Sequence, residues 1–191
     1  MGNKLGRTFY NRATLKVARE LLGKYLVFRK DGNGFCGKIV ETEAYIGLHD
    51  EASHASKGKT KRNEVMFGPP GYAYIYFTYG MYHCLNFVTE RKGYPAAVLI
   101  RALEPKDGIE IMEKNRKTDR IDNLTSGPGK VCMALGLNRS LNGTDLCSDV
   151  LHVEDRNQKK EKIASSRRVG INIQKDKKWR FYIKDNRFVS R

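Results

Sequence analysis

Residues 72–88 constrain the fold of this chain more than any other stretch. Aromatic and β-branched residues, which favour strands, dominate the stretch, and residues 79–81 (Tyr-Gly-Met) interrupt it near its middle. The pattern predicts a β-hairpin whose tight tip carries Tyr79 and Met81. Large apolar side chains at an exposed tip are typical of a surface that inserts into a partner. The tyrosines within the two strands have a simpler alternative role as core residues.

Another strand is predicted at residues 35–45, and the two faces of its second half differ in chemistry. Because side chains alternate along a strand, Glu41, Glu43 and Tyr45 share one face and mostly aliphatic residues share the other. If the aliphatic face packs inward, the carboxylates face a cleft or water. A carboxylate beside an aromatic ring, followed in the chain by His54, can activate water next to a flat substrate. An ordinary solvated acidic edge is the alternative interpretation.

The remaining pattern predicts one domain spanning residues 1–191, of α+β class. We expect a single mixed domain with a curved, mostly antiparallel sheet, flanking helices and a protruding β-hairpin. Apolar periodicity and capping residues mark the helices, and short β-branched runs mark the strands. Expected helices cover 11–22, 107–115 and 131–137; expected strands cover 25–28, 35–45, 96–103, 168–173 and 179–183; a turn is expected at 31–34, loops at 47–71 and 116–125, and a mobile basic loop at 155–168.

The charge of the chain indicates a polyanionic partner. Thirty-six basic and 21 acidic residues give a net charge of +15, which favours nucleic acid over a membrane surface. No apolar run is long enough to span a bilayer. The four cysteines are far apart and form no C-x-x-C pair, which argues against a zinc site and fits reduced thiols in the cytoplasm.

Three basic residues are candidates for specific contacts. Arg101 directly follows the apolar residues 98–100 within the expected strand 96–103, so it needs a partner, either Glu104 or a glutamate of the 35–45 strand. Arg62 ends a basic run in the 47–71 loop. Lys130 follows Ser-Gly-Pro-Gly at the start of a predicted helix, where backbone amides and a lysine can bind a DNA phosphate.

Three classes of function fit these features. A base-excising enzyme would use a carboxylate to activate water, aromatic residues to hold an extruded base, and a tip residue to fill the gap. A metal-dependent nuclease would use Glu41, Glu43 and Asp50, although the sequence lacks a compact cluster of metal carboxylates. A non-catalytic binding module would use the aromatics for stacking. The module does not explain why a strongly basic protein keeps an acidic strand that repels phosphate.

The order of several short motifs resembles the alkyladenine (3-methyladenine) DNA glycosylase family. The resemblance extends from about Leu15 to Ile183. Each motif alone is a weak signal, and the specificity comes from finding all of them in this order. The motifs are Val40-Glu-Thr-Glu-Ala-Tyr45, Thr60-x-Arg62-Asn63, Met66-Phe67, Tyr79-Gly-Met-Tyr82, Leu99-x-Arg101-Ala-Leu-Glu-Pro105, Ser126-Gly-Pro128, Arg168-Val-Gly170 and Arg180-Phe-Tyr182.

This resemblance implies a role for each site residue. Glu43 matches the general base, and Arg101 and the backbone carbonyl of Val169 match the groups that help hold the attacking water. The other matches concern the base and the DNA. Tyr45, His54 and Tyr76 match the walls around the flipped base, Asn86 the residue that crowds the exocyclic amine of guanine, and Tyr79 the side chain inserted into the minor groove; Met81, Arg62 and Lys130 are expected to contact DNA beside them.

The resemblance also implies the reaction and the partners. The expected substrate is double-stranded DNA containing alkylated or deaminated purines, and the expected reaction is hydrolysis of the N-glycosidic bond. No lysine lies in the constellation, so we expect a monofunctional enzyme, which leaves an abasic site and uses no metal or cofactor. We expect a monomer that does not bind membranes. The motif match is poor at His83 and in the 155–168 segment.

Overall fold

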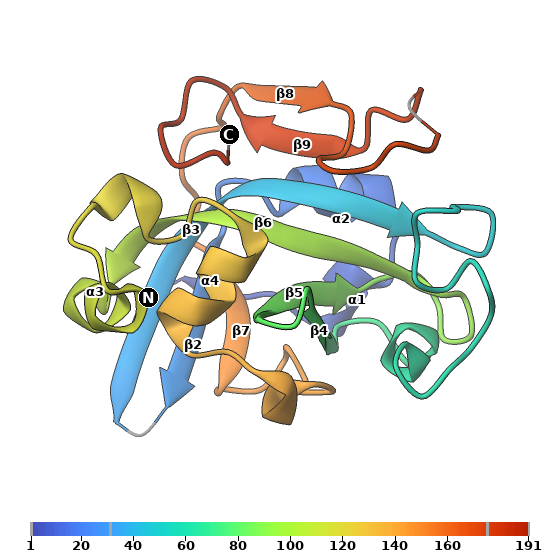
Figure 1. Ribbon diagram of the computed structural model, residues 1–191, viewed down its shortest axis with the longest axis horizontal. Coiled ribbons are helices and arrows are strands. Elements are labelled where there is room, and N and C mark those ends of the chain that lie inside the picture. Colours follow the sequence, from blue (N-terminus) through green and yellow to red (C-terminus); the bar gives the residue numbers. More distant parts are fainter. Residues whose placement is uncertain (1, 31, 175, 191) are drawn as a thin grey trace.

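The computed structural model describes residues 2–30, 32–174 and 176–190. Its strands form one sheet, and every recorded strand pair is antiparallel (Figure 1). The expected α+β fold with a mostly antiparallel sheet is therefore confirmed. The strands are β1 (Asn3–Lys4), β2 (Tyr25–Lys30), β3 (Asn33–Ile46), β4 (Ala73–Thr78), β5 (Tyr82–Val88), β6 (Ala96–Asp107), β7 (Leu151–Asp155), β8 (Ile163–Ser166) and β9 (Arg180–Ile183).

Strand β3 is the longest strand and the centre of the sheet. The strand order is β1-β7-β2-β3-β6-β5-β4, and β9 pairs with both β3 and β8. The first half of β3 pairs with β2, its residues Glu41–Glu43 pair with β9 on the same edge, and β6 runs along its other edge. Glu43 lies opposite Leu99 on one side and Arg180 on the other. This position places Glu43 inside the sheet, with strands on both sides.

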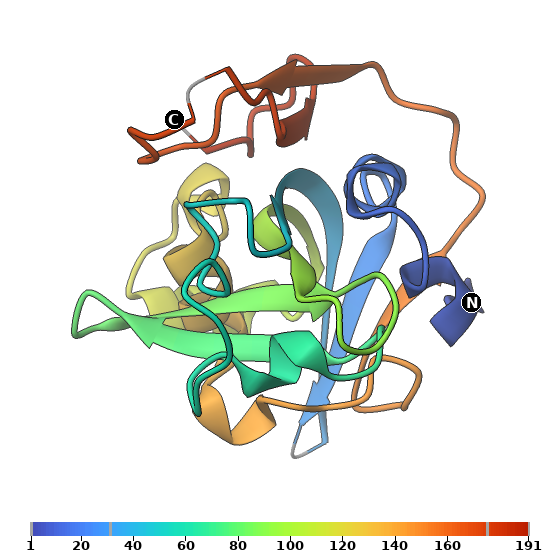
Figure 2. The same cartoon turned by 90° about the vertical axis from the view of Figure 1, so that its right-hand side faces the viewer.

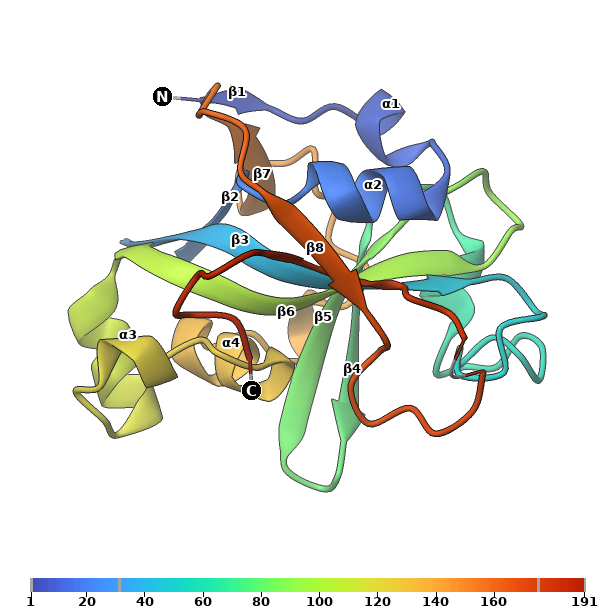
Figure 3. The ribbon, with the colours of Figure 1, turned by 90° about the horizontal axis from the view of Figure 1, so that it is seen from above.

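The helices cover the two faces of the sheet unequally. In Figure 3, α2 lies on one face, and α3 and α4 lie on the other together with the projecting β4–β5 hairpin. The Thr42 hydroxyl donates to the carbonyl of Ala18 at 2.9 Å, which ties β3 to α2. No helix of the described residues is long and apolar enough to cross a membrane. The helices are α1 (Arg7–Tyr10), α2 (Thr14–Glu20), α3 (Ile109–Arg116) and α4 (Pro128–Leu135), with 3-10 turns η1 (Glu64–Phe67), η2 (Ile121–Asn123) and η3 (Arg139–Leu141).

Two buried clusters support the side of the molecule that carries the hairpin. The main core includes Phe28, Ile39 and Phe87, which have no exposed surface. A smaller cluster lies beneath the loop between β3 and β4, and it contains Met66 and Tyr74. The second cluster matters for the site because it holds the base of the hairpin against this loop.

Several predicted boundaries are wrong by a few residues. The helix expected at 11–22 begins only at Thr14, because the backbone at Asn11 closes α1 instead of opening α2. The helix expected from Asp107 begins at Ile109, since β6 continues to Asp107 and Gly108 adopts a left-handed conformation. Asp31, the first residue of the expected turn, lies outside the described residues.

The largest errors lie near the C-terminus. Residues 168–173 form no strand, since Gly170 has a positive φ of 73° and Arg168 is bound to Asp50. The segment 155–168, expected to be a loop, contributes β8, and β7 just before it was not predicted. Figure 2 shows the chain after β7 passing along the edge of the molecule before β8 and β9 lie across one end of the sheet.

Candidate active site

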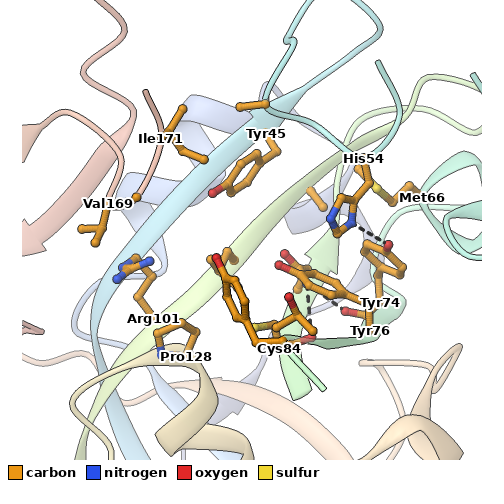
Figure 4. Close-up of a pocket in the computed structure, with 17 residues that line it drawn as sticks. Tyr45, His54, Met66, Tyr74, Tyr76, Cys84, Arg101, Pro128, Val169 and Ile171 are labelled. Carbon is orange, nitrogen blue, oxygen red and sulfur yellow. Dashed lines mark hydrogen bonds between the residues drawn. The ribbon is translucent and has the colours of Figure 1, made fainter. Parts of the chain in front are cut away.

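A pocket with a cavity volume of about 230 Å³ opens beside the β4–β5 hairpin. Its walls come from the end of β3, the first half of β6, the loop after β3 with η1, the hairpin, the start of α4 and the segment 169–171 (Figure 4). The volume is several times the roughly 30 Å³ share of a water molecule, so a small ring system can enter. The predicted site residues Tyr45, His54, Tyr76, Tyr79, Asn86, Arg101 and Val169 all line this pocket.

Aromatic side chains form two opposed walls. Figure 4 shows Tyr45 across the open space from His54 and Tyr76. The rings of His54 and Tyr76 lie 4.4 Å apart at 76°, and His54 Nδ1 lies 2.9 Å from the hydroxyl of Tyr74. Asn63 donates to the backbone carbonyl of His54 at 2.8 Å and so fixes the loop that carries it. The walls are therefore held in place from behind and can enclose a flat ring.

Glu43 lies directly behind the pocket and is fully buried. The hydroxyl of Tyr45 donates to Oε2 at 2.9 Å, Arg101 donates to the same oxygen at 3.3 Å, and the backbone amide of Val169 donates to Oε1 at 2.7 Å. All three donors belong to residues that line the pocket. The expectation for Val169 concerned its carbonyl, whereas its amide makes the contact with Glu43.

Glu41 faces the same arginine but not the pocket. Arg101 donates to its Oε1 at 2.9 Å and Arg180 donates to that oxygen at 2.6 Å. Ser190 adds two further bonds, from its amide to Oε2 at 2.7 Å and from its hydroxyl to Oε1 at 2.9 Å. The partner of Arg101 is thus the pair of glutamates and not Glu104. The alternative of a solvated acidic strand face is wrong, because β9 and the C-terminal segment cover it.

Burial and nearby charges act in opposite directions on the pKa values of Glu43 and Arg101. Burial raises the pKa of Glu43, although Arg101, the Val169 amide and the Tyr45 hydroxyl oppose the rise. Burial disfavours the Arg101 cation, but Glu43 and Glu41 outweigh this and raise its pKa. Burial and Arg62 lower the pKa of His54. Glu43 is therefore a stronger base than a free carboxylate, beside a fixed positive charge.

The arrangement of the carboxylates does not support the hypothesis of a metal-dependent nuclease. Glu41 is bound by arginines and Ser190, and both oxygens of Asp50 accept from Arg168 at 2.6 and 2.7 Å. Among the residues that the structure describes, no group of three His, Cys, Asp or Glu side chains could hold a metal ion. The carboxylates are therefore paired with guanidinium groups and do not form a joint ligand set.

Of the candidate DNA contacts Tyr79, Met81, Arg62 and Lys130, only Tyr79 lines the pocket. Tyr79 is 87% exposed and Met81 63% exposed at the hairpin tip, so the expected exposed tip is confirmed. Tyr79 has a positive φ of 51°, a conformation that bulky residues rarely adopt. Arg62 lies 5.5 Å from the ring of Tyr76 and donates to the carbonyl of Phe77 at 3.2 Å. Lys130 contacts Asn123 and Ser126 and does not line the pocket.

Sequence reasoning did not assign a role to several lining residues. Tyr74 shares a strand face with Tyr76, and this alternation is the signal that could have found it. Met66 and Ile171 come from distant segments without a periodic pattern. The pair of Asp50 and Arg168 is separated by 118 residues, and no local pattern connects them.

The fold and the site together define a class: a strongly basic α+β protein with an aromatic pocket backed by a buried carboxylate. A family profile described as methylpurine-DNA glycosylase matches residues 8–187. The chain belongs to the methylpurine-DNA glycosylase family, which makes it a hydrolase of DNA repair with DNA as its substrate.

Relatives from bacteria and an archaeon match almost the whole chain. A protein of Methanocella arvoryzae is 53% identical over 98% of this chain and 96% of its own length. Proteins of Desulfitobacterium hafniense and Alkaliphilus oremlandii are 49% and 48% identical, over 98% of this chain and 98% and 99% of their own lengths. All three carry the provisional name 3-methyladenine DNA glycosylase.

Proposed function

We propose that this chain flips alkylated or deaminated purines out of duplex DNA and hydrolyses their N-glycosidic bond with a water activated by Glu43. The observation that carries the proposal is the placement of Glu43. It is a fully buried carboxylate with a raised pKa, and its three hydrogen-bond donors all line an aromatic pocket. A base in this position reaches the sugar side of a purine that is held in the pocket.

The reaction needs charge stabilisation as well as a base. Breaking the glycosidic bond gives the sugar oxocarbenium character, as in glycoside hydrolysis, and the ionised Glu43 opposes that positive charge. Glu43 then accepts a proton from the attacking water, which Arg101 and the backbone of Val169 help to position. Alkylation at N3 or N7 makes the purine cationic and therefore a better leaving group. The aromatic walls favour such an electron-poor ring.

The rest of the pocket gives each remaining residue a task. Tyr45 stacks on one face of the purine, and His54 and Tyr76 bound the other. Asn86 is held by bonds from its amide to the carbonyls of Tyr74 and Cys84 at 3.0 and 3.3 Å, so it forms a fixed wall that crowds an exocyclic amine. A fixed amide at this point favours purines that lack the amine of guanine.

The hairpin tip and the basic groups engage the duplex. Tyr79 fills the gap left by the extruded nucleotide, and Met81 widens the apolar tip beside it. Arg62 and Lys130 contact phosphates on either side of the pocket. Because the net charge is +15, binding should weaken steeply as salt increases, by about 0.9 in the slope of log K against log salt for each phosphate contact.

The product should be an intact strand with an abasic site. None of the described residues that line the pocket is a lysine, so no side-chain amine is at hand for a Schiff base that would lead to strand cleavage. The reaction as proposed uses no metal or cofactor, and one protomer carries every group that it needs.

One experiment tests the whole proposal. The chain is incubated with a duplex that carries a single methylated purine and a label at one end, in EDTA, and each sample is divided into two. The proposal predicts a strand break only in the half treated with hot alkali, which cleaves abasic sites. A break without alkali would contradict the monofunctional reaction. Activity that disappears in EDTA and returns with a divalent ion would contradict the water-activation scheme.

A further inference from the structure

A buried ion pair lies behind one wall of the pocket. Arg168 donates to both oxygens of Asp50, at 2.6 and 2.7 Å, and to the backbone carbonyl of Ala44 at 3.0 Å. The side chains of Arg168 and Asp50 are 1% and 0% exposed. The guanidinium group lies 4.7 Å from the centre of the Tyr45 ring and 5.2 Å from that of Trp179. Tyr45 lines the pocket and Arg168 does not, so the cation lies behind the ring.

This arrangement presents an electrostatic problem for the proposed substrate. A cationic purine stacked on Tyr45 would lie roughly 9 Å from the Arg168 cation, since stacked ring centres are about 4.5 Å apart. Repulsion between like charges at this separation, in a site with little water, would lower the affinity for the cationic purine about tenfold. Arg62 poses no such problem behind Tyr76, because it is exposed and water screens it.

We propose that Asp50 is a specificity residue, which neutralises Arg168 behind Tyr45 and so lets the pocket accept a positively charged purine. The inference rests on the proposed function, in which the base enters between Tyr45 and Tyr76. Arg168 also has a structural task, because its planar group packs on Tyr45 and ties the segment that carries Val169 to β3 and to the loop before His54. Asp50 neutralises the charge of this guanidinium group and leaves its packing contacts in place.

A purely structural role makes a different prediction. Asp50 also accepts bonds from the amides of Ile46 and Ala52, at 3.1 and 3.3 Å, so it orders the loop that leads to His54. If order were its only contribution, changing Asp50 would weaken binding of every damaged purine alike. If charge is the contribution, the loss should fall on cationic purines and should be reversed by removing Arg168 as well.

The test compares two duplexes whose target nucleotide carries a 2′-fluorine, which slows cleavage of the glycosidic bond. One contains cationic 3-methyladenine and the other contains neutral hypoxanthine, neither of which carries the amine of guanine, and the readout is the ratio of their dissociation constants. We expect D50N to weaken binding of the cationic duplex about tenfold relative to the neutral one. The double variant D50N/R168Q should return the ratio to within about threefold of the parent's value.

A matched control is available at the other end of the sheet. Glu154 is a buried carboxylate that accepts from Arg156 at 3.0 Å, and neither residue lines the pocket. E154Q should leave the ratio unchanged. Equal losses of D50N on both duplexes, or a double variant as impaired as D50N, would overturn the inference.

A further variant covers the case in which D50N does not fold. R168Q keeps the negative charge of Asp50, so the ratio should stay the same or shift toward the cationic base, and a shift toward the neutral base would overturn the inference. A parent chain that does not prefer the cationic duplex to undamaged DNA would contradict the proposed function itself. A parent that does prefer it, with a folded D50N variant that leaves the ratio unchanged, would contradict only the role of Asp50.

Discussion

Glu41 and Glu43 lie two residues apart on β3, are both fully buried, and accept from the same arginine, yet their surroundings differ. Glu41 accepts four hydrogen bonds, all from groups outside the pocket except Arg101. Glu43 accepts three, all from residues that line the pocket. The comparison shows that a buried carboxylate becomes a candidate base through the position of its donors and not through burial alone.

The two glutamates also explain how Arg101 can stay in the interior. A buried cation with one carboxylate would leave part of its guanidinium without a partner. Here Glu41 binds Nε, Glu43 binds one terminal nitrogen, and the Ser190 hydroxyl lies 3.3 Å from the other. Glu41 therefore holds the arginine in place, which allows Glu43 to remain only partly paired and close to a substrate.

The largest expected effect comes from replacing the proposed base. E43Q keeps nearly the same shape but cannot accept a proton from water, so excision should fall by about 10²–10⁴-fold while DNA binding persists. Single-turnover excision and a gel-shift titration measure the two quantities. Excision near the parent rate would reassign the water to another group, with Glu41 the first to examine.

The matched variant E41Q should affect stability more than chemistry. It removes a charge from between two arginines, which should lower the free energy of unfolding by up to about 3–5 kcal/mol. Urea unfolding measures this change, and excision is then compared per folded molecule at low temperature. A loss of excision as large as that of E43Q, with stability unchanged, would remove the distinction between the two glutamates.

A substitution of Tyr79 tests the hairpin tip without changing a contact of either glutamate. Tyr79→Asn suits the positive φ at this position, so stability should stay the same or rise slightly while the wedge is lost. Excision from a well-paired duplex should fall about tenfold or more, because unstacking a base costs a few kcal/mol. The loss should be smaller when the same lesion is mispaired. A larger loss on the mispaired duplex would argue for a stacking platform in place of a wedge.

The smallest expected effect is on the pH dependence of excision, and it tests the comparison of Glu43 with Glu41 most directly. Glu43 must be deprotonated to act, and its pKa is raised by burial, so excision should fall on acidification at a higher pH than a free glutamate would require. Y45F removes a donor that lowers this pKa, and the acid limb of the pH–rate profile should move to still higher pH. Y182F, which changes a tyrosine outside the pocket, is the control. An acid limb that Y45F leaves in place would mean that another group controls the rate.

Much of this site could be predicted because its signals are local. The strand alternation that places Glu43 and Tyr45 on one face depends only on the backbone period. The exposed tip with Tyr79 follows from a run of β-formers interrupted at a glycine. These patterns, with the motif order that resembles the family, give the fold class and the candidate residues, whose individual roles stay predictions.

The sequence by itself determined the strands, the hairpin, the basic charge and the residues that supply the chemistry, because short-range periodicity and composition encode them. Only the tertiary structure decided which glutamate faces the pocket, that Asp50 pairs with Arg168, and that Val169 donates its amide to Glu43. Those contacts join segments more than 100 residues apart. They depend on how β9 and the C-terminal segment pack across β3, and side-chain packing of distant segments leaves no periodic trace in the chain.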